Sequence, residues 1–347
     1  MTLQDGQTPT LARVAASAGV SVATVSKVLN GRADVSAETR ARVEGLLAEH
    51  DYVARRGEAV LREADQRTVE LVFHGPLGAY TSEILQGVLE AGGEAGVSVS
   101  VSVRPRRQPS PGELRPATWA RRLADRGRRA VVDVVDDAQH GDLQALLRSG
   151  LAVVVIDPLS PPRKEVASVG TTNFSGGLAA TTHLLGLGHR RIAYLGADAT
   201  AAYNQARVHG YRAALEAAGL EVPAAYVRIG SFDFDAGVGG GGALLDLDEP
   251  PTAVFAATDE IAAGVLEAAR RRGLRVPEDL SVVGFDDTAL ARTLSPPLTT
   301  VRQPLREMGR LALQTALRVA DREPLDSHHV ELATELVVRS STAAPAA

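Results

Sequence analysis

Cysteine is absent from the 347-residue chain, which excludes disulfide bridges, thiolate metal sites and a cysteine nucleophile. Aromatic residues make up only 4%, so small aliphatic side chains must fill the core. No run approaches the roughly 18 apolar residues that a membrane helix needs, and the N-terminal residues lack the pattern of a signal peptide. We therefore expect a cytoplasmic protein with no membrane partner, and no cofactor or metal is expected.

An excess of positive charge is also absent. The formal net charge is -5, so the chain as a whole does not predict nucleic-acid binding, and any DNA contact must come from a local surface. The chain is longer than an ordinary domain with a single hydrophobic core, which predicts two or three folding units.

Three short helices are predicted near the N-terminus. Ser21 and Ser36 are residues that can cap the second and third, and Thr10 can cap the first. Gly19 tolerates the positive φ of a tight turn, and the small Ala15 allows two helices to cross closely. This pattern is typical of a helix-turn-helix, whose second helix enters the major groove of DNA. The expected core residues are Val14, Val20, Val25, Val28, Val43, Leu46 and Leu47.

The exposed start of the second helix carries the predicted DNA contacts, beginning at Ser21. Val22, Ala23 and Lys27 would face the base edges. Because valine and alanine side chains offer no hydrogen bonds, specificity would rest on thymine methyl groups, Lys27 and DNA shape. The residues expected to donate to phosphates are Thr24, Ser26 and Asn30, with Thr10 nearby at the start of the first helix.

From residue 69 onward, apolar runs of strand length alternate with helical segments. This alternation predicts parallel sheets made of right-handed βαβ units. The proline-rich residues 157–164 divide the runs into two sets, which predicts two similar lobes. The expected strands are residues 69–73, 97–103, 130–135, 152–156, 191–195, 225–229, 253–256 and 281–285, and the expected helices are residues 82–95, 143–149, 177–187, 206–218 and 259–272.

Long, ordered motifs of the chain resemble those of the LacI/GalR family of bacterial repressors. The resemblance begins with the helix-turn-helix and includes Tyr52, near the end of the third helix. It implies an α/β protein in which an N-terminal helix-turn-helix head precedes a two-lobed, periplasmic-binding-protein-like domain with parallel sheets. The motifs that carry it are residues 11–30, 35–40, 184–193, 207–212, 280–287 and 296–304.

The resemblance also implies domain boundaries. Residues 1–54 would form the DNA-binding head, residues 55–66 a hinge or linker, and residues 67–347 the effector-binding and dimerisation domain. The N-lobe would comprise residues from about 67–160 and about 288–320, and the C-lobe residues from about 161–287 and about 321–340.

A hinge helix of this family wedges a leucine into the minor groove, and Leu61 stands at the matching place. The surrounding residues depart from the family pattern, because Gly57 weakens a helix and Glu58 stands where a small residue is usual. Arg55 and Arg56 are therefore predicted to hold the linker to phosphates instead.

Sugars bind to two-lobed α/β domains at the carboxyl ends of the strands. Asp157, Asp259 and Asp286 follow predicted strands, and paired acceptors of this kind suit sugar hydroxyl groups. Alternatives stay open at this stage: Asp259 can cap a helix, Phe232 can belong to the core, and Asp286 can belong to a turn. The resemblance implies effector contacts by Tyr80, Ser82, Asp157, Arg207, Phe232, Thr258 and Asp286.

The sequence therefore predicts a homodimeric repressor, not an enzyme, that binds a pseudo-palindromic operator and a sugar or sugar-like effector. The helices at residues 82–95 and 259–272 would form the interfaces, and the same parts suit an inducer or a co-repressor.

Two alternatives belong to other classes. Residues 237–242 match G-x-G-x-x-G, which alone would suggest a nucleotide-binding dehydrogenase, and so many glycines predict a frayed helix start. The second alternative is a sugar-binding module without regulatory DNA binding.

Overall fold

The computed structural model describes residues 11–29, 32, 34–49, 68–75, 77–104, 115–134, 142–160 and 166–346. The chain divides into two compact units, Met1–Glu63 and Ala64–Ala347, which we call the head and the effector domain. Among the described residues, no helix is both long and apolar enough to cross a membrane.

The head contains three helices around a small aliphatic core, as predicted. Gly19 adopts a φ of 64° in the turn between the first two helices. Ser21 Oγ accepts from the Thr24 amide, and Ser36 Oγ accepts from the Thr39 amide, so both predicted caps are confirmed. The helices are α1 (Leu11–Ala18), α2 (Val22–Leu29) and α3 (Ala37–Glu49). Their buried apolar residues are Val14, Ala15, Ala18, Val25, Val28, Val43 and Leu47.

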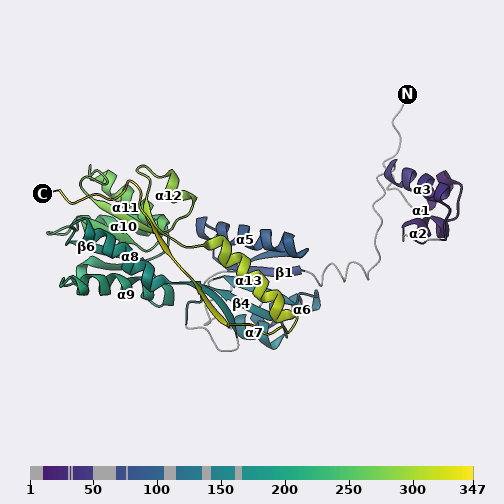
Figure 1. The fold of residues 1–347 in the computed structure, drawn as a ribbon, viewed down its shortest axis with the longest axis horizontal. Helices are drawn as coiled ribbons and strands as arrows, with labels where there is room; N and C mark the ends of the chain where they lie inside the picture. The colour runs from purple at the N-terminus through teal and green to yellow at the C-terminus, as the bar shows by residue number, and fades with distance from the viewer. Residues whose placement is uncertain are drawn as a thin grey trace, which may run out of the picture. The chain divides into compact units, whose positions relative to one another are not determined.

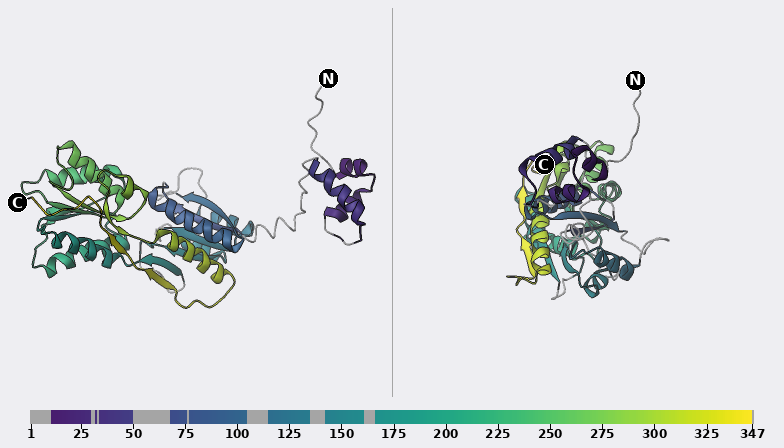
Figure 2. Two further views of the ribbon diagram at one scale, coloured as in Figure 1. Left: turned by 45° about the horizontal axis from the view of Figure 1, so that its top comes forward. Right: turned by 90° about the vertical axis from the view of Figure 1, so that its right-hand side faces the viewer.

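The effector domain contains two parallel α/β sheets, each covered by helices, and Figure 1 shows both (a second view is in Figure 2). The first sheet has the order β11-β5-β4-β3-β1-β2, and we call it with its helices the first lobe. Its strands are β1 (Thr68–His74), β2 (Ser98–Arg104), β3 (Ala130–Val134), β4 (Ala152–Ile156), β5 (Ala167–Thr171) and β11 (His329–Leu332). Its helices are the adjacent pair α5 (Ala79–Ala95) and α13 (Leu305–Ala320), and the pair α6 (Pro116–Asp125) and α7 (Asp142–Arg148).

The second lobe contains the sheet with the order β12-β10-β9-β8-β6-β7, in which only the β10–β12 pairing is antiparallel. Helices α10 and α11 cover one face of this sheet, and α8 and α9 cover the other (Figures 1 and 2). Its strands are β6 (Ile192–Ala197), β7 (Val227–Gly230), β8 (Ala253–Ala256), β9 (Ser281–Asp286), β10 (Thr299–Arg302) and β12 (Glu335–Val337). Its helices are α8 (Asn173–Gly186), α9 (Ala202–Ala217), α10 (Phe234–Leu245), α11 (Asp259–Arg271) and α12 (Ala289–Thr293).

The sheet membership differs from the lobe ranges expected from the sequence. Strand β5, expected in the C-lobe, pairs with β4 in the first sheet, and β11 joins it there. Strand β10, expected in the N-lobe, pairs with β9 in the second sheet. The reason is that the proline-rich segment connects two neighbouring strands of one sheet. The chain crosses between lobes later, at Thr172, after β10 and after β11.

The glycine run of α10 serves helix packing. Helix α10 begins at Phe234, where Asp233 is the N-cap, so Gly237 lies inside the helix and the expected frayed start is wrong. A Cβ at Gly237 would lie 2.3 Å from the Ile261 carbonyl oxygen of α11. A dinucleotide fingerprint places its glycines in the turn between strand and helix, so the run does not match that geometry.

Candidate functional site

Four aspartates with positive φ lie at the carboxyl ends of strands β4, β6 and β9. Asp157 has a φ of 45°, Asp198 of 25°, Asp286 of 113° and Asp287 of 56°. Positive φ is unfavourable for residues other than glycine, and such residues concentrate at binding and catalytic sites. The carboxyl ends of the strands in both lobes therefore carry an unusual backbone.

Arg207 lies in α9 at the centre of this region, and it is 2% exposed. Its Nε donates to Asn173 Oδ1 at 2.7 Å, and its Nη1 donates to the Ala257 carbonyl at 2.7 Å. The guanidinium stacks over Phe285 with Cζ 3.7 Å from the ring centroid. These contacts fix the plane of the guanidinium, and among the described residues no hydrogen-bond partner is recorded for its Nη2.

Asp157 and Asp286 present carboxyl groups from the two lobes. Asp157 Oδ2 accepts from the Tyr80 hydroxyl at 2.5 Å, and Asp286 Oδ1 accepts from Gln303 Nε2 at 2.7 Å. Asp286 Oδ1 also lies 4.0 Å from Arg207 Nη1. Each carboxyl group thus has one oxygen that accepts from no described residue.

The two carboxyl groups also have shifted pKa values. Burial raises the pKa of Asp157, and burial raises that of Asp286 well above its ordinary value, although Arg207 opposes both shifts. The two carboxyl groups also interact across the lobes, because the negative charge of Asp157 contributes to the raised pKa of Asp286. We call Tyr80, Asp157, Arg207 and Asp286 the candidate effector site.

Thr258 is the N-cap of α11, and its hydroxyl oxygen accepts from the Ile261 amide at 3.1 Å. Asp259 is therefore not the cap. Its carboxylate instead accepts from the amide and hydroxyl of Thr288 and from the hydroxyl of Thr300. Asp259 thus anchors the segment after β9, and with it the position of Asp286.

The remaining predicted effector residues have mixed surroundings. Ser82 is exposed, and its hydroxyl donates to the Gly78 carbonyl at the start of its own helix, so its contact with an effector stays a prediction. Phe232 is partly buried against the second-lobe core, and its ring lies 5.6 Å from that of Tyr203.

Three residues that contact the candidate effector site were not predicted from the sequence. Tyr203 lies one helical turn before Arg207 on α9, and the guanidinium carbon is 5.4 Å from its ring centroid. This i, i+4 spacing was a usable signal. Asn173 and Gln303 follow β5 and β10, two strands that the apolar pattern did not predict.

The second helix of the head exposes the predicted DNA-reading residues. Val22 is 46% exposed, and Ala23 and Lys27 are also exposed. Lys27 Nζ lies 2.6 Å from Asp34 Oδ2, and this hydrogen bond lowers the pKa of Asp34. Five predicted DNA contacts lie outside the described residues: Thr10, Asn30, Arg55, Arg56 and Leu61.

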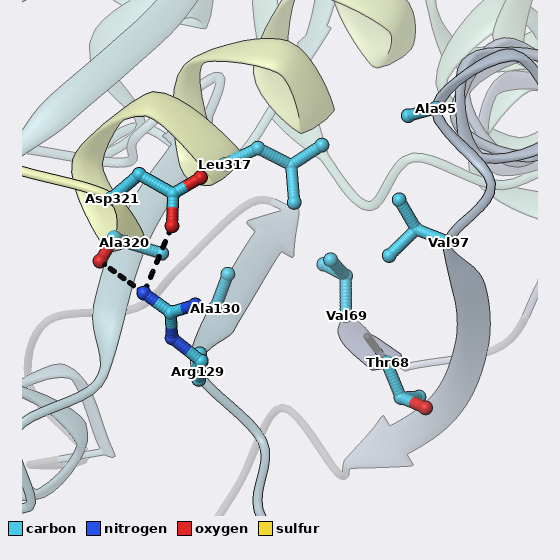
Figure 3. Close-up of a pocket in the computed structure, with 9 residues that line it drawn as sticks. All are labelled: Thr68, Val69, Ala95, Val97, Arg129, Ala130, Leu317, Ala320 and Asp321. Carbon is cyan, nitrogen blue, oxygen red and sulfur yellow. Dashed lines mark hydrogen bonds and ion pairs between the residues drawn. The ribbon is translucent and has the colours of Figure 1, made fainter. Parts of the chain in front are cut away.

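A separate cavity of about 230 Å³ lies at the opposite end of the first lobe, beside the amino ends of β1 and β3 (Figure 3). Arg129 closes one side by donating to the Ala320 carbonyl and to Asp321. Its other walls are mainly aliphatic, including Val69 and Val97. It shares no residue with the candidate effector site.

Comparisons with known proteins agree with this architecture. Residues 10–54 match the family of bacterial regulatory proteins, lacI family, and residues 181–342 match the periplasmic binding protein-like domain. The HTH-type transcriptional regulator CelR of Thermobifida fusca is 36% identical, and DegA of Bacillus subtilis (strain 168) is 31% identical, each over 96% of this chain and 98% of the relative.

Solved structures are similar over nearly the whole chain. The transcriptional regulator CelR–cellobiose complex has a TM-score of 0.72 and 34% identity, and covers 96% of this chain and 99% of that one. The lac repressor dimer bound to operator and the anti-inducer ONPF has a TM-score of 0.77 and 27% identity, with coverages of 97% and 100%.

Proposed function

Because the chain belongs to the LacI family of bacterial regulatory proteins, which are DNA-binding transcriptional regulators, we propose that a sugar bound at the candidate effector site controls its affinity for an operator. The observation that carries this proposal is the fixed guanidinium of Arg207 beside two carboxyl groups that each keep one oxygen free of described partners. A planar fork of donors between acceptors matches neighbouring hydroxyl groups of a sugar ring.

Two relatives support a sugar as the ligand class. The CelR structure contains cellobiose, and a lac repressor structure contains ONPG. In this chain the partly buried rings of Tyr203 and Phe232 lie near Arg207 and supply apolar surface beside the polar groups, while Phe285 is fully buried beneath the guanidinium. Sugar sites in proteins need both kinds of surface, because one carries hydroxyl groups and the other the faces of the ring.

We assign DNA reading to α2, with Val22, Ala23 and Lys27 facing the bases. Lys27 must leave Asp34 to reach DNA, and an exposed ion pair of this kind is weak enough to exchange. Val22 supplies an exposed methyl surface for thymine.

We propose a homodimer that joins equivalent surfaces of two effector domains. Strand β2 is an edge strand whose Val101 and Val103 are 43% and 54% exposed, so these two valines face outward. Leu89 on the adjacent α5 is also exposed. Exposed edges with apolar side chains are normally covered in native proteins. In the second lobe, Ile229 of β7 and Phe234 of α10 are also exposed.

The proposal includes the absence of catalysis. The candidate effector site holds carboxyl groups and a guanidinium whose partners orient them for binding, and the relatives are regulators. The tight packing of Gly237 against α11 argues against the dehydrogenase alternative.

A salt titration of binding to the DNA upstream of the gene tests the function, repeated with monosaccharides and cellobiose. We expect saturable binding that falls steeply with salt and changes with one sugar. Equal binding to a scrambled duplex, together with tight sugar binding, would instead support a sugar-binding module without a regulatory role.

A further inference from the structure

Two hydrogen bonds join the lobes away from the segments where the chain crosses between them. The Ala79 amide of α5 donates to Glu260 Oε1 of α11 at 3.3 Å. The Ala202 amide of α9 donates to the Leu159 carbonyl at 2.8 Å. The first bond has a side-chain acceptor, so a substitution at Glu260 can remove it, whereas the second joins two backbone groups.

Both bonds adjoin the candidate effector site in sequence. Ala79 precedes Tyr80, whose hydroxyl bonds to Asp157, and Leu159 follows Asp157 by two residues. On the other lobe, Glu260 follows the anchoring Asp259. A movement that opens the lobes must therefore break these bonds and displace the residues that would hold the effector.

The environment of Glu260 suits an electrostatic contact between lobes. Its carboxylate reaches the N-terminus of α5, where unpaired amides and the helix dipole attract negative charge. Gly78 is the N-cap there, and a Cβ at this position would lie only 2.8 Å from Glu260 Oε1. The missing side chain at Gly78 thus gives the carboxylate room to approach.

We propose that Glu260 is a positioning residue that latches α11 to the N-terminus of α5 and so favours the closed arrangement of the lobes around the effector. This inference extends the proposed function, because the closed arrangement brings Tyr80 and Asp157 to Arg207 and Asp286. Glu260 acts through the geometry of the lobes and touches no group assigned to the effector.

The test compares Glu260→Ala, Glu260→Gln and Glu260→Asp with Glu216→Ala. Glu216 lies exposed on α9 of the same lobe, and its replacement makes the same change in charge. Lobe separation is measured by spin labels at Arg121→Cys and Ala217→Cys, one exposed position on each lobe, in a chain that has no other cysteine. Sugar affinity is measured by calorimetry, and thermal unfolding checks that each variant folds.

We expect Glu260→Ala to lengthen the mean label distance and to weaken sugar binding about two- to fivefold, the range of a carboxylate at a helix N-terminus. Glu260→Asp should behave similarly, because its side chain is too short, whereas Glu260→Gln keeps the acceptor oxygen and should be intermediate. Wild-type distances in Glu260→Ala, or the same shift in Glu216→Ala, would overturn the latch. Distances measured without sugar test the latch even if no sugar binds.

Discussion

Asp286 and Asp287 are adjacent carboxyl groups with different partners. Asp287 accepts from Arg339 and, at 2.7 Å, from Arg302, whereas Asp286 accepts from Gln303 and keeps one oxygen available. We expect Asp287→Asn to lower the free energy of unfolding by roughly 1–3 kcal/mol, because two arginines lose their anion. Asp286→Asn should cost less stability and weaken sugar binding at least about tenfold. Thermal unfolding and calorimetry distinguish the two, and lost sugar binding in a stable Asp287→Asn protein would contradict these roles.

Because the pKa values of Asp157 and Asp286 are raised, acidification should weaken sugar binding but stabilise the folded protein. Sugar hydroxyl groups donate to carboxylates, so the Kd of the sugar should rise on acidification. Because both pKa values are raised, the rise should begin at a pH above the ordinary pKa of aspartate. The folded protein takes up these protons at a pH where the unfolded chain does not. The free energy of unfolding without sugar should therefore rise as the pH falls, relative to Asp286→Asn.

Calorimetric titrations and unfolding curves from about pH 8 to about pH 5, a range above the ordinary pKa of aspartate, measure both effects. The comparison with Asp286→Asn removes this carboxyl group together with its electrostatic coupling to Asp157 and Asp259. A sugar Kd that stays constant over that range would contradict the expected protonation of the acceptors.

The glycine run of α10 gives a prediction at the scale of elements. Gly237→Ala would place a Cβ 2.3 Å from the Ile261 carbonyl oxygen, whereas a Cβ at Gly239 would meet no atom within 4 Å. We expect Gly237→Ala to destabilise the protein by about 1–3 kcal/mol through overpacking. Gly239→Ala should stabilise it by about 0.5–1 kcal/mol, because alanine favours a helix. Denaturant unfolding measures both, and equal effects would show that α10 and α11 are not closely packed.

Apolar runs predicted the strands whose own sequence is uninterruptedly apolar. The bounds of β4 and β8 agree with the predicted strands, because each is a short, uninterrupted run of apolar residues, nearly all of them buried. Strand β5, with the sequence ASVGT, was missed because serine, glycine and threonine interrupt its apolar pattern. It is a strand because it lies between β4 and β11, which supply hydrogen bonds that no local pattern reveals.

The candidate effector site was predictable only where its residues follow strands that an apolar run identifies. Asp157 and Asp286 follow recognisable strands, and the structure brings them together with Tyr80 and Arg207, although their contact with an effector stays a prediction. Asn173 and Gln303 follow strands that were missed. The crossing points between lobes depend on which sheet each strand joins, and that choice is made by tertiary packing.

At the scale of the whole molecule, the proposed regulation requires that the two binding functions be thermodynamically linked. If the sugar changes operator affinity, the operator changes sugar affinity by the same factor. A coupling of about 5- to 150-fold is typical of allosteric proteins. This reciprocity holds for an inducer and for a co-repressor, and only the sign differs.

Two substitutions separate the functions that the linkage joins. Lys27→Ala should weaken operator binding and leave the sugar Kd measured without DNA unchanged, because Lys27 belongs to the head. Asp286→Asn should shift the response to sugar to at least about tenfold higher sugar concentration while operator binding without sugar persists, because Asp286 belongs to the effector domain. Fluorescence anisotropy of labelled operator and calorimetry with sugar, each with and without the other ligand, measure all four affinities. Equal sugar affinity with and without saturating operator would show that the two sites are uncoupled.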